Sequence, residues 1–174
     1  MRHAGVRRLC VAAATGSVRL LSSACQSGAA GRLYVPAEQG GAAEMAFAPP
    51  GVDEAELVTR LIAAVRRLAA TMPGVPRPVL MAYHVGITRI ENDRFSGPAV
   101  LKALALLSDP AIQAAAAGNG DALVVVIPDG LYAELRGEGL PGRGWFPVPA
   151  AGVWMQRRAI LPGHRDGPFR PPAR

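Results

Sequence analysis

The sequence predicts one α/β (α+β) domain, built as a two-layer sandwich in which a mixed or mostly antiparallel sheet carries helices on one face. Short apolar runs of strand length alternate with segments of helical spacing, and pairs of strands stand at both ends of this series. A doubly wound fold is not expected, because strands and helices do not alternate regularly and no GxGxxG follows the first strand.

The first expected unit is a β-hairpin. Residues 32–36 and 45–48 are two short apolar runs, and the Gly40-Gly41 turn separates them. Two consecutive prolines end the second run, because proline cannot continue a hydrogen-bonded strand.

A long amphipathic helix is expected over residues 53–72. Asp53 is a good N-cap, the first turn is acidic, and two arginines stand near the end. Apolar side chains recur at helical spacing on one face of this segment: Leu57, Leu61, Ala64, Val65 and Leu68. Residues 72–78, which include three prolines, form a connector to the next strand.

The middle of the chain predicts a strand, a turn and a helix. Residues 79–87 form a strongly apolar run that is typical of a buried strand, and residues 91–93 form the turn after it. The Ser-Gly-Pro sequence at 96–98 begins a helix over 99–107, because proline suits the first helical turn.

The last third of the chain predicts two more helices and three more strands. In chain order these are a short helix over 109–117, an interior strand over 122–127, a helix over 130–135 after the N-cap Asp129, and closing strands 145–147 and 153–156 joined around Gly152.

Both ends of the chain are expected to lie outside the folded domain. Residues 1–31 form a poorly ordered basic segment, residues 32–158 the domain, and residues 159–174 a disordered tail rich in proline and arginine. The net charge of +6 comes from these ends, since residues 38–156 hold nine basic and twelve acidic side chains. Specific nucleic-acid binding is therefore not expected, because it normally needs a basic face on the folded unit.

The N-terminal segment also determines the expected location. Charged residues followed by the apolar run 9–18 have the order of a signal peptide, but Arg19 interrupts that run. We expect a cytoplasmic protein, with export through this signal-like segment as the alternative, and no membrane span, which needs ~20 apolar residues. Cys10 and Cys25 fall in the same segment, so no disulfide is expected in the core.

The order and spacing of several segments resemble the catalytic domain of class III nucleotidyl cyclases, the adenylate and guanylate cyclases, in the diverged form of long actinobacterial proteins. Residues 41–50 look like the hairpin that carries a metal-binding carboxylate in that family. His84-Val-Gly-Ile is similar to the family's His-x-Gly-x strand, and residues 97–100 to the Gly-x-x-Val at the start of a helix. Residues 123–132 and 145–154 resemble the next strand and helix and the closing hairpin.

This resemblance covers residues 32–158 and implies a ferredoxin-like core. It leaves out the family's first strand and the two helices after it, which bear the first metal-binding carboxylate. Residues 1–31 contain no aspartate and are not expected to supply that unit.

The residues that the family uses for chemistry are replaced in this chain. Ala42 stands at the position of the second metal-binding carboxylate, Leu101 at that of an asparagine, and Ala105 at that of an arginine. Nucleotidyl transfer depends on metal ions and cations that stabilise developing charge. We therefore expect no cyclase activity, no metal site and no cofactor, and the case for nucleotide binding is weak.

The preferred hypothesis is a catalytically inactive, cyclase-like domain that serves as a regulatory or signalling module through a protein partner or a homodimer. Cyclase domains pair to build their sites, and an inactive copy can retain the pairing surface, for which Leu101, Leu104 and Ala105 are the candidates. One alternative is a cyclase half-site that binds nucleotide or needs a partner to supply the missing groups. Another is a decayed gene fragment without a function.

The remaining polar and aromatic side chains favour structural roles. His84 is the sole histidine of the body and has no zinc ligands at suitable spacing, so we interpret it as a structural residue of its strand. Trp145 and Trp154 are expected to pack against the helix layer rather than to stack on a base.

Overall fold

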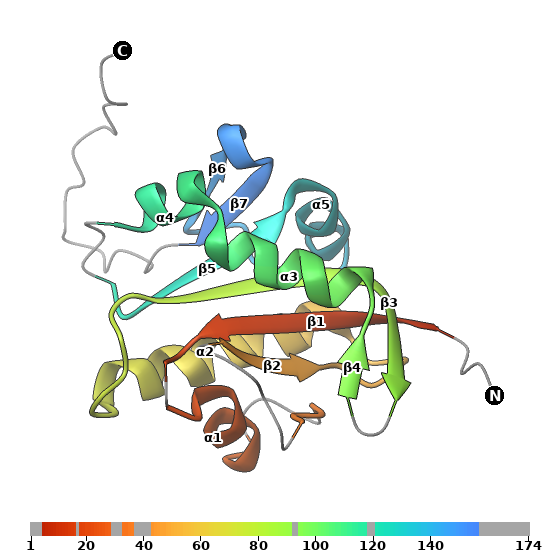
Figure 1. Cartoon of the computed structure of the whole chain (residues 1–174). Helices are drawn as coiled ribbons and strands as arrows, with labels where there is room; N and C mark the ends of the chain where they lie inside the picture. The colour runs from red at the N-terminus through yellow and green to blue at the C-terminus, as the bar shows by residue number, and fades with distance from the viewer. Residues whose placement is uncertain are drawn as a thin grey trace.

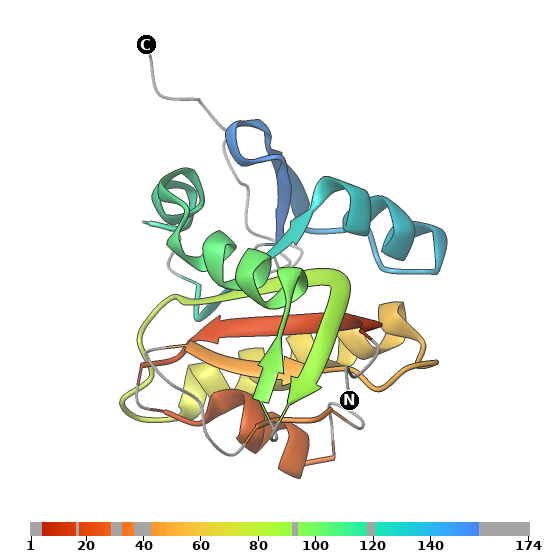
Figure 2. The same cartoon turned by 45° about the vertical axis from the view of Figure 1, so that its right-hand side comes forward.

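The structure is a computed structural model of the 174-residue chain, and it describes residues 5–16, 18–28, 33–36, 43–91, 94–117 and 121–156. In this part of the chain seven strands form one sheet with the order β2-β1-β3-β5-β7-β6, and β4 pairs with β3 outside that series. Figures 1 and 2 show the sheet between two groups of helices.

The strands are β1 (Val6–Ala14), β2 (Ala43–Phe47), β3 (Val79–Glu91), β4 (Arg94–Ser96), β5 (Leu123–Pro128), β6 (Trp145–Val148) and β7 (Val153–Gln156). The helices are α1 (Leu20–Gln26), α2 (Glu54–Thr71), α3 (Pro98–Ser108), α4 (Pro110–Ala116) and α5 (Asp129–Gly137), with a short 3₁₀ turn at Pro149–Ala151. Strands β3 and β5 pair in parallel, and the other neighbours pair antiparallel. The mixed α/β class that the sequence predicts is therefore confirmed.

The expectation of a poorly ordered segment over residues 1–31 is wrong for most of that range. Residues 6–14 form β1, which lies between β2 and β3, and residues 20–26 form α1. A strand and a helix therefore precede β2, although the sequence was not expected to supply them. The sequence of β1 contains only two β-branched residues and three alanines, so its strand propensity is weak. Two neighbouring strands and full burial of residues 9–13 hold it in the sheet instead.

Helices cover both faces of the sheet, whereas the sequence predicted helices on one face. We call the two sides the α2 face, which α1, α2 and α5 cover, and the α3 face, which α3 and α4 cover. Strand β3 shows the alternation, because Val79 and Met81 join the core under α2 while Leu80 and Ala82 join the core under α3. Strands that are buried on both sides have continuous apolar sequences. Such a sequence does not by itself show whether helices cover one face of the sheet or both.

Of the two strands expected in the hairpin before α2, only the second is a continuous strand among the described residues. Strand β2 is continuous, whereas Tyr34 forms a single antiparallel bridge to Phe47. The turn at Gly40-Gly41, and with it Ala42, lies outside the described residues.

Helix starts follow the sequence in one place and differ in two. The Asp53 side chain accepts a hydrogen bond from the Glu56 amide at the start of α2. At α4, Asp109 accepts from two amides and is the cap, whereas the sequence placed it inside the helix. Asp129 makes no capping bond, because it is the first residue of α5 and not the residue before it.

The start of α3 is held close to β3 by two glycines. Gly97 has a φ of 125°, and a Cβ placed on it would lie 2.6 Å from the Ile87 carbonyl oxygen. A Cβ on Gly86 would lie 3.2 Å from the Ala99 Cβ. Small residues on both sides of this contact therefore allow the helix to approach the strand closely.

Candidate functional site

The outer side of α3 carries the residues that the sequence proposed as an interface. Leu101 is 69% exposed, Ala105 is exposed and Leu104 is half-buried. We call these three residues the α3 stripe. The opposite side of the helix buries Ala99, Val100, Ala103 and Leu107 against the sheet. The structure therefore brings the stripe residues together on one helix and leaves Leu101 open to solvent.

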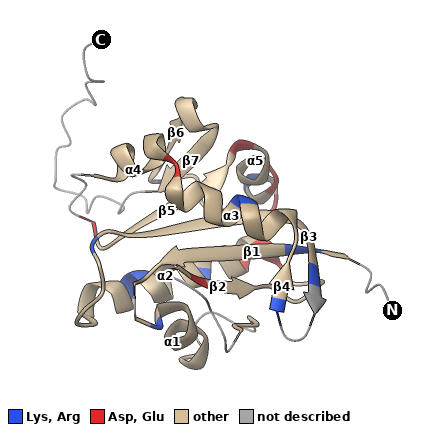
Figure 3. Ribbon diagram, viewed as in Figure 1, with Lys and Arg blue, Asp and Glu red and all other residues tan. Residues whose placement is uncertain are grey.

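The exposed residues of α3 and α4 include few charges. They are Pro98, Leu101, Lys102, Ala105, Ser108, Pro110, Gln113 and Ala114. Figure 3 shows basic residues beside this surface on β1, β3 and β4, while acidic residues gather on α5 and near the start of α2. A soluble helix usually places charged or polar residues on its outer side. The α3 stripe departs from that pattern.

On the other side of the sheet, the carboxylate of Glu44 binds the start of α1. Its two oxygens accept hydrogen bonds from the Leu21 amide at 2.6 Å, the Ser22 amide at 2.8 Å and the Ser22 hydroxyl at 2.6 Å. Glu44 is only 3% exposed. A buried carboxylate is stable when several donors bind its charge. These bonds occupy both Glu44 oxygens and join β2 to α1.

Carboxylates suited to metal binding are scarce in the described part of the chain. Strand β1 contains no Asp or Glu, and no group of three or more His, Cys, Asp and Glu side chains there is placed to hold a metal ion. His84 lies half-buried in β3, as a strand residue.

Cys10 and Cys25 are free thiols in folded elements rather than in a loose segment. Burial raises the pKa of Cys10 to about 12, although the charge of Arg8 opposes the rise. Burial, followed by the charge of Glu44, raises the pKa of Cys25 to about 11. Both thiols are therefore protonated near neutral pH and are weak nucleophiles.

Structure comparison gives this fold a known counterpart. A crystal structure of an adenylate/guanylate cyclase/hydrolase from Silicibacter pomeroyi superposes with a TM-score of 0.53 at 16% sequence identity, over 88% of this chain and 99% of that one. The chain has a nucleotidyl-cyclase-like fold. A bacterial light-regulated adenylyl cyclase matches with a TM-score of 0.48 at 12% identity, over 93% of this chain and 55% of that one. No protein-family model and no curated protein matches the sequence.

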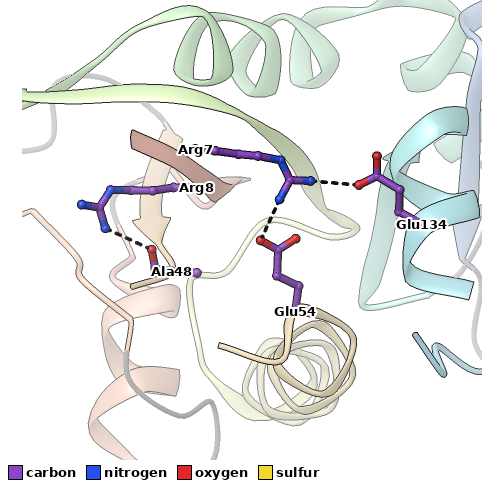
Figure 4. Close-up of polar contacts among 5 residues, drawn as sticks. All are labelled: Arg7, Arg8, Ala48, Glu54 and Glu134. Carbon is purple, nitrogen blue, oxygen red and sulfur yellow. Dashed lines mark hydrogen bonds and ion pairs between the residues drawn. The ribbon is translucent and has the colours of Figure 1, made fainter. Parts of the chain in front are cut away.

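Within this cyclase-like fold, an ion-pair cluster joins β1 to two helices of the α2 face. One Arg7 nitrogen lies 2.9 Å from a Glu134 oxygen of α5, and another lies 3.6 Å from a Glu54 oxygen of α2 (Figure 4). Burial raises the pKa of Glu54, and the charges of Glu138 and Glu134 add to that rise while Arg7 opposes it. Arg8, the next residue, points away from this cluster toward the Ala48 carbonyl.

Two features of the cyclase-like domain were not anticipated from the sequence. The sequence does not single out Glu44, because a single acid in a hairpin strand usually faces water; its place between apolar neighbours is the available signal. Arg7 falls in the segment expected to be poorly ordered, and no local pattern connects it to Glu54 or Glu134.

The described helices of the cyclase-like domain are short or polar compared with a membrane span. Among the described residues, no single helix is both long and apolar enough to cross a bilayer. Helices α3 and α4 reach the length and composition only when taken together, across a bend of 52°.

Proposed function

We propose that this chain is a catalytically inactive, nucleotidyl-cyclase-like domain that acts as a regulatory module by binding a protein partner, either a second copy or another chain, through the α3 stripe. The observation that carries the proposal is the exposure of Leu101 beside Ala105 on a helix whose outer side has few charges. Exposed apolar side chains gathered on one surface are typical of interaction sites.

The resemblance to cyclases supports the catalytic part of this proposal. Leu101 and Ala105 stand where that family has an asparagine and an arginine, and Ala42 where it has a metal-binding carboxylate. Strand β1 offers no acid, and Glu44 is bound by α1. Loss of one oriented polar group lowers a catalytic rate by ~10²-fold or more, and several are missing here.

Nucleotide assays test the catalytic part. The purified chain is incubated with ATP or GTP and Mn²⁺, alone and together with any intact cyclase domain that a neighbouring gene encodes, and cyclic nucleotide is measured by mass spectrometry. We expect no product from the chain alone and no gain over the intact domain alone. Product from the chain alone, or a gain in the mixture, would favour the half-site alternative and contradict inactivity.

Association measurements test the binding part. Light scattering at high protein concentration and recovery of partners from lysate are compared for the wild type, Leu101→Lys and the control Ala63→Lys, which alters an exposed position of α2. We expect the wild type and the control to associate and Leu101→Lys to lose association. A monomeric wild type that recovers no partner would refute the proposal.

A further inference from the structure

His84 lies in β3 on the face of the sheet that α3 covers. Strand alternation places it on the same side as Leu80 and Ala82, which belong to the core under α3. The next residue on that side, Gly86, approaches Ala99 of α3 so closely that an added Cβ would lie 3.2 Å from the Ala99 Cβ. The imidazole of His84 therefore stands where α3 contacts the sheet.

The surroundings of His84 do not favour a second proton. Its Nδ1 is shielded from solvent and has no hydrogen-bond partner. Burial lowers the pKa of His84 below its ordinary value of 6.5, and the charge of Lys102 on α3 lowers it further, while a backbone hydrogen bond at Val85 opposes both effects.

Among the residues that the structure describes on β1, β4, β5 and α3, the charged groups on this side of His84 are positive. The titratable groups there are Arg8 and Cys10 of β1, Arg94 of β4 and Lys102 of α3. Cys10 stands directly opposite His84 in the strand register and is an uncharged thiol near neutral pH, since its pKa is about 12. Strand β5 has no titratable group, and Asp129, the residue after it, begins α5 on the α2 face.

We propose that His84 makes the docking of α3 on the sheet sensitive to acid, because a proton on its imidazole places a new positive charge beneath Lys102, and none of the described residues on β1, β4, β5 or α3 offers a carboxylate there to balance it. The neutral imidazole is compatible with the docked helix. The protonated imidazole favours a state in which α3 has moved away from β3 and water reaches the ring.

The sign and the size of the effect follow from proton linkage. The pKa of His84 is lowered while α3 is docked, so the undocked state binds the proton more tightly and docking weakens as the pH falls below 6.5. If the docked state takes up no proton, the undocking equilibrium constant rises by about tenfold at one pH unit below the ordinary pKa. This is the upper limit of the effect at pH 5.5.

The consequence for binding rests on the proposed function. If the α3 stripe binds a partner, acid that loosens α3 also weakens that binding. The motion of α3 itself needs no partner, so it can be measured on the isolated chain.

Amide hydrogen exchange of the full chain at pH 5.5 and pH 7.5 tests the proposal. Rates are corrected for intrinsic exchange and compared between residues 98–108 and the reference helix 54–71, in the wild type, His84→Gln and Lys102→Met. We expect exchange of 98–108 in the wild type to rise by up to about tenfold at pH 5.5, a smaller rise in Lys102→Met, and none in His84→Gln.

Three outcomes would overturn the acid-sensitive docking. One is an equal pH response of 98–108 in the wild type and His84→Gln, and another is an equal response of both helices, which indicates global unfolding. If His84→Gln does not fold, Lys102→Met still decides, because a pH response as large as that of the wild type removes the stated cause. A chain that binds no partner but shows the expected exchange behaviour would count against the proposed function alone.

Discussion

The two faces of the sheet are held together by different chemistry. On the α2 face, polar bonds join the helices to the strands: Glu44 binds α1, Arg7 bridges α2 and α5, and Arg66 of α2 donates to Gln156 of β7. On the α3 face, α3 docks by apolar packing and by the close contact of Gly86 with Ala99. Both faces bury an apolar core, and the α2 face adds directional polar bonds to that core.

This difference extends to the outer surfaces. Helix α2 exposes Glu56, Arg60 and Arg67, of which the first two form an ion pair, whereas α3 exposes Leu101 and a single lysine. A helix with charges outside and apolar groups inside needs no further cover. The α3 stripe leaves apolar surface exposed, and this is the surface that the proposed partner would bury. Of the two helices, only α2 therefore has a polar outer side.

The largest effect should come from the close contact on the α3 face. Gly97→Ala places a Cβ 2.6 Å from a backbone oxygen at a positive φ, so we expect a loss of about 3 kcal/mol in the free energy of unfolding, measured in urea. The control is Gly130→Ala in α5, where an added Cβ meets nothing within 4 Å and helix propensity improves. Equal stability of the two variants would show that α3 does not dock by this contact.

The directional bonds of the α2 face should give the next effect. Glu44→Gln replaces one acceptor oxygen by an amide that faces N–H donors, so we expect a loss of about 2 kcal/mol by the same measurement. Glu56→Gln, which alters an exposed carboxylate, should change stability by less than about 0.5 kcal/mol. If Glu44→Gln leaves the free energy of unfolding unchanged, packing alone holds α1 in place.

A smaller effect is expected at the exposed ion pairs. Arg7→Gln should lower the free energy of unfolding by less than about 1 kcal/mol, because both side chains of the 2.9 Å pair between Arg7 and Glu134 are more than half exposed. High salt should reduce even that loss, since it screens exposed charges. Since Arg7 opposes the rise in the pKa of Glu54, its removal should move that pKa further up, as an NMR titration of the carboxyl would report. A Glu54 pKa that does not move would show that the charges do not interact in solution.

The smallest effect is expected at the α3 stripe itself. Leu101→Ala should change the free energy of unfolding by no more than about 0.5 kcal/mol, whereas Leu107→Ala on the buried side of the same helix should cost about 3 kcal/mol. A large loss at Leu101 would mean that this side chain supports the monomer, and its exposure would no longer indicate a partner site.

Much of the fold from α2 onward follows from local sequence signals. Asp53 starts α2 one residue before the helix begins, and the β-branched run within 123–128 is an interior strand. Strands 145–148 and 153–156 meet around Gly152, which has the left-handed conformation. These elements have caps, prolines or branched residues at their own ends, so the pattern is readable without the tertiary structure.

The N-terminal unit and the polar contacts could not be read in that way. Strand β1 owes its conformation to partners 29 to 82 residues later, as in the pairs Cys10 with Phe47 and Val6 with Thr88. The cover on the second face of the sheet, and the bonds of Glu44 and Arg7, arise when distant segments meet. The exposure of Leu101 differs from the sequence pattern as well, because helical spacing allows Val100, Leu101, Leu104 and Leu107 all to face the core, whereas the structure buries Val100 and Leu107 and leaves Leu101 exposed.

The place of β1 between β2 and β3 bears on how the chain folds as the ribosome makes it. Val6 pairs with Thr88, and the hydroxyl of Thr88 donates to the Val6 carbonyl 82 positions earlier. At ordinary synthesis rates this partner emerges roughly 4 to 16 s after the first strand. During that interval an apolar strand made early has one edge unpaired, so nascent chains halted before β3 should aggregate or bind chaperones, while chains that extend past β3 should not.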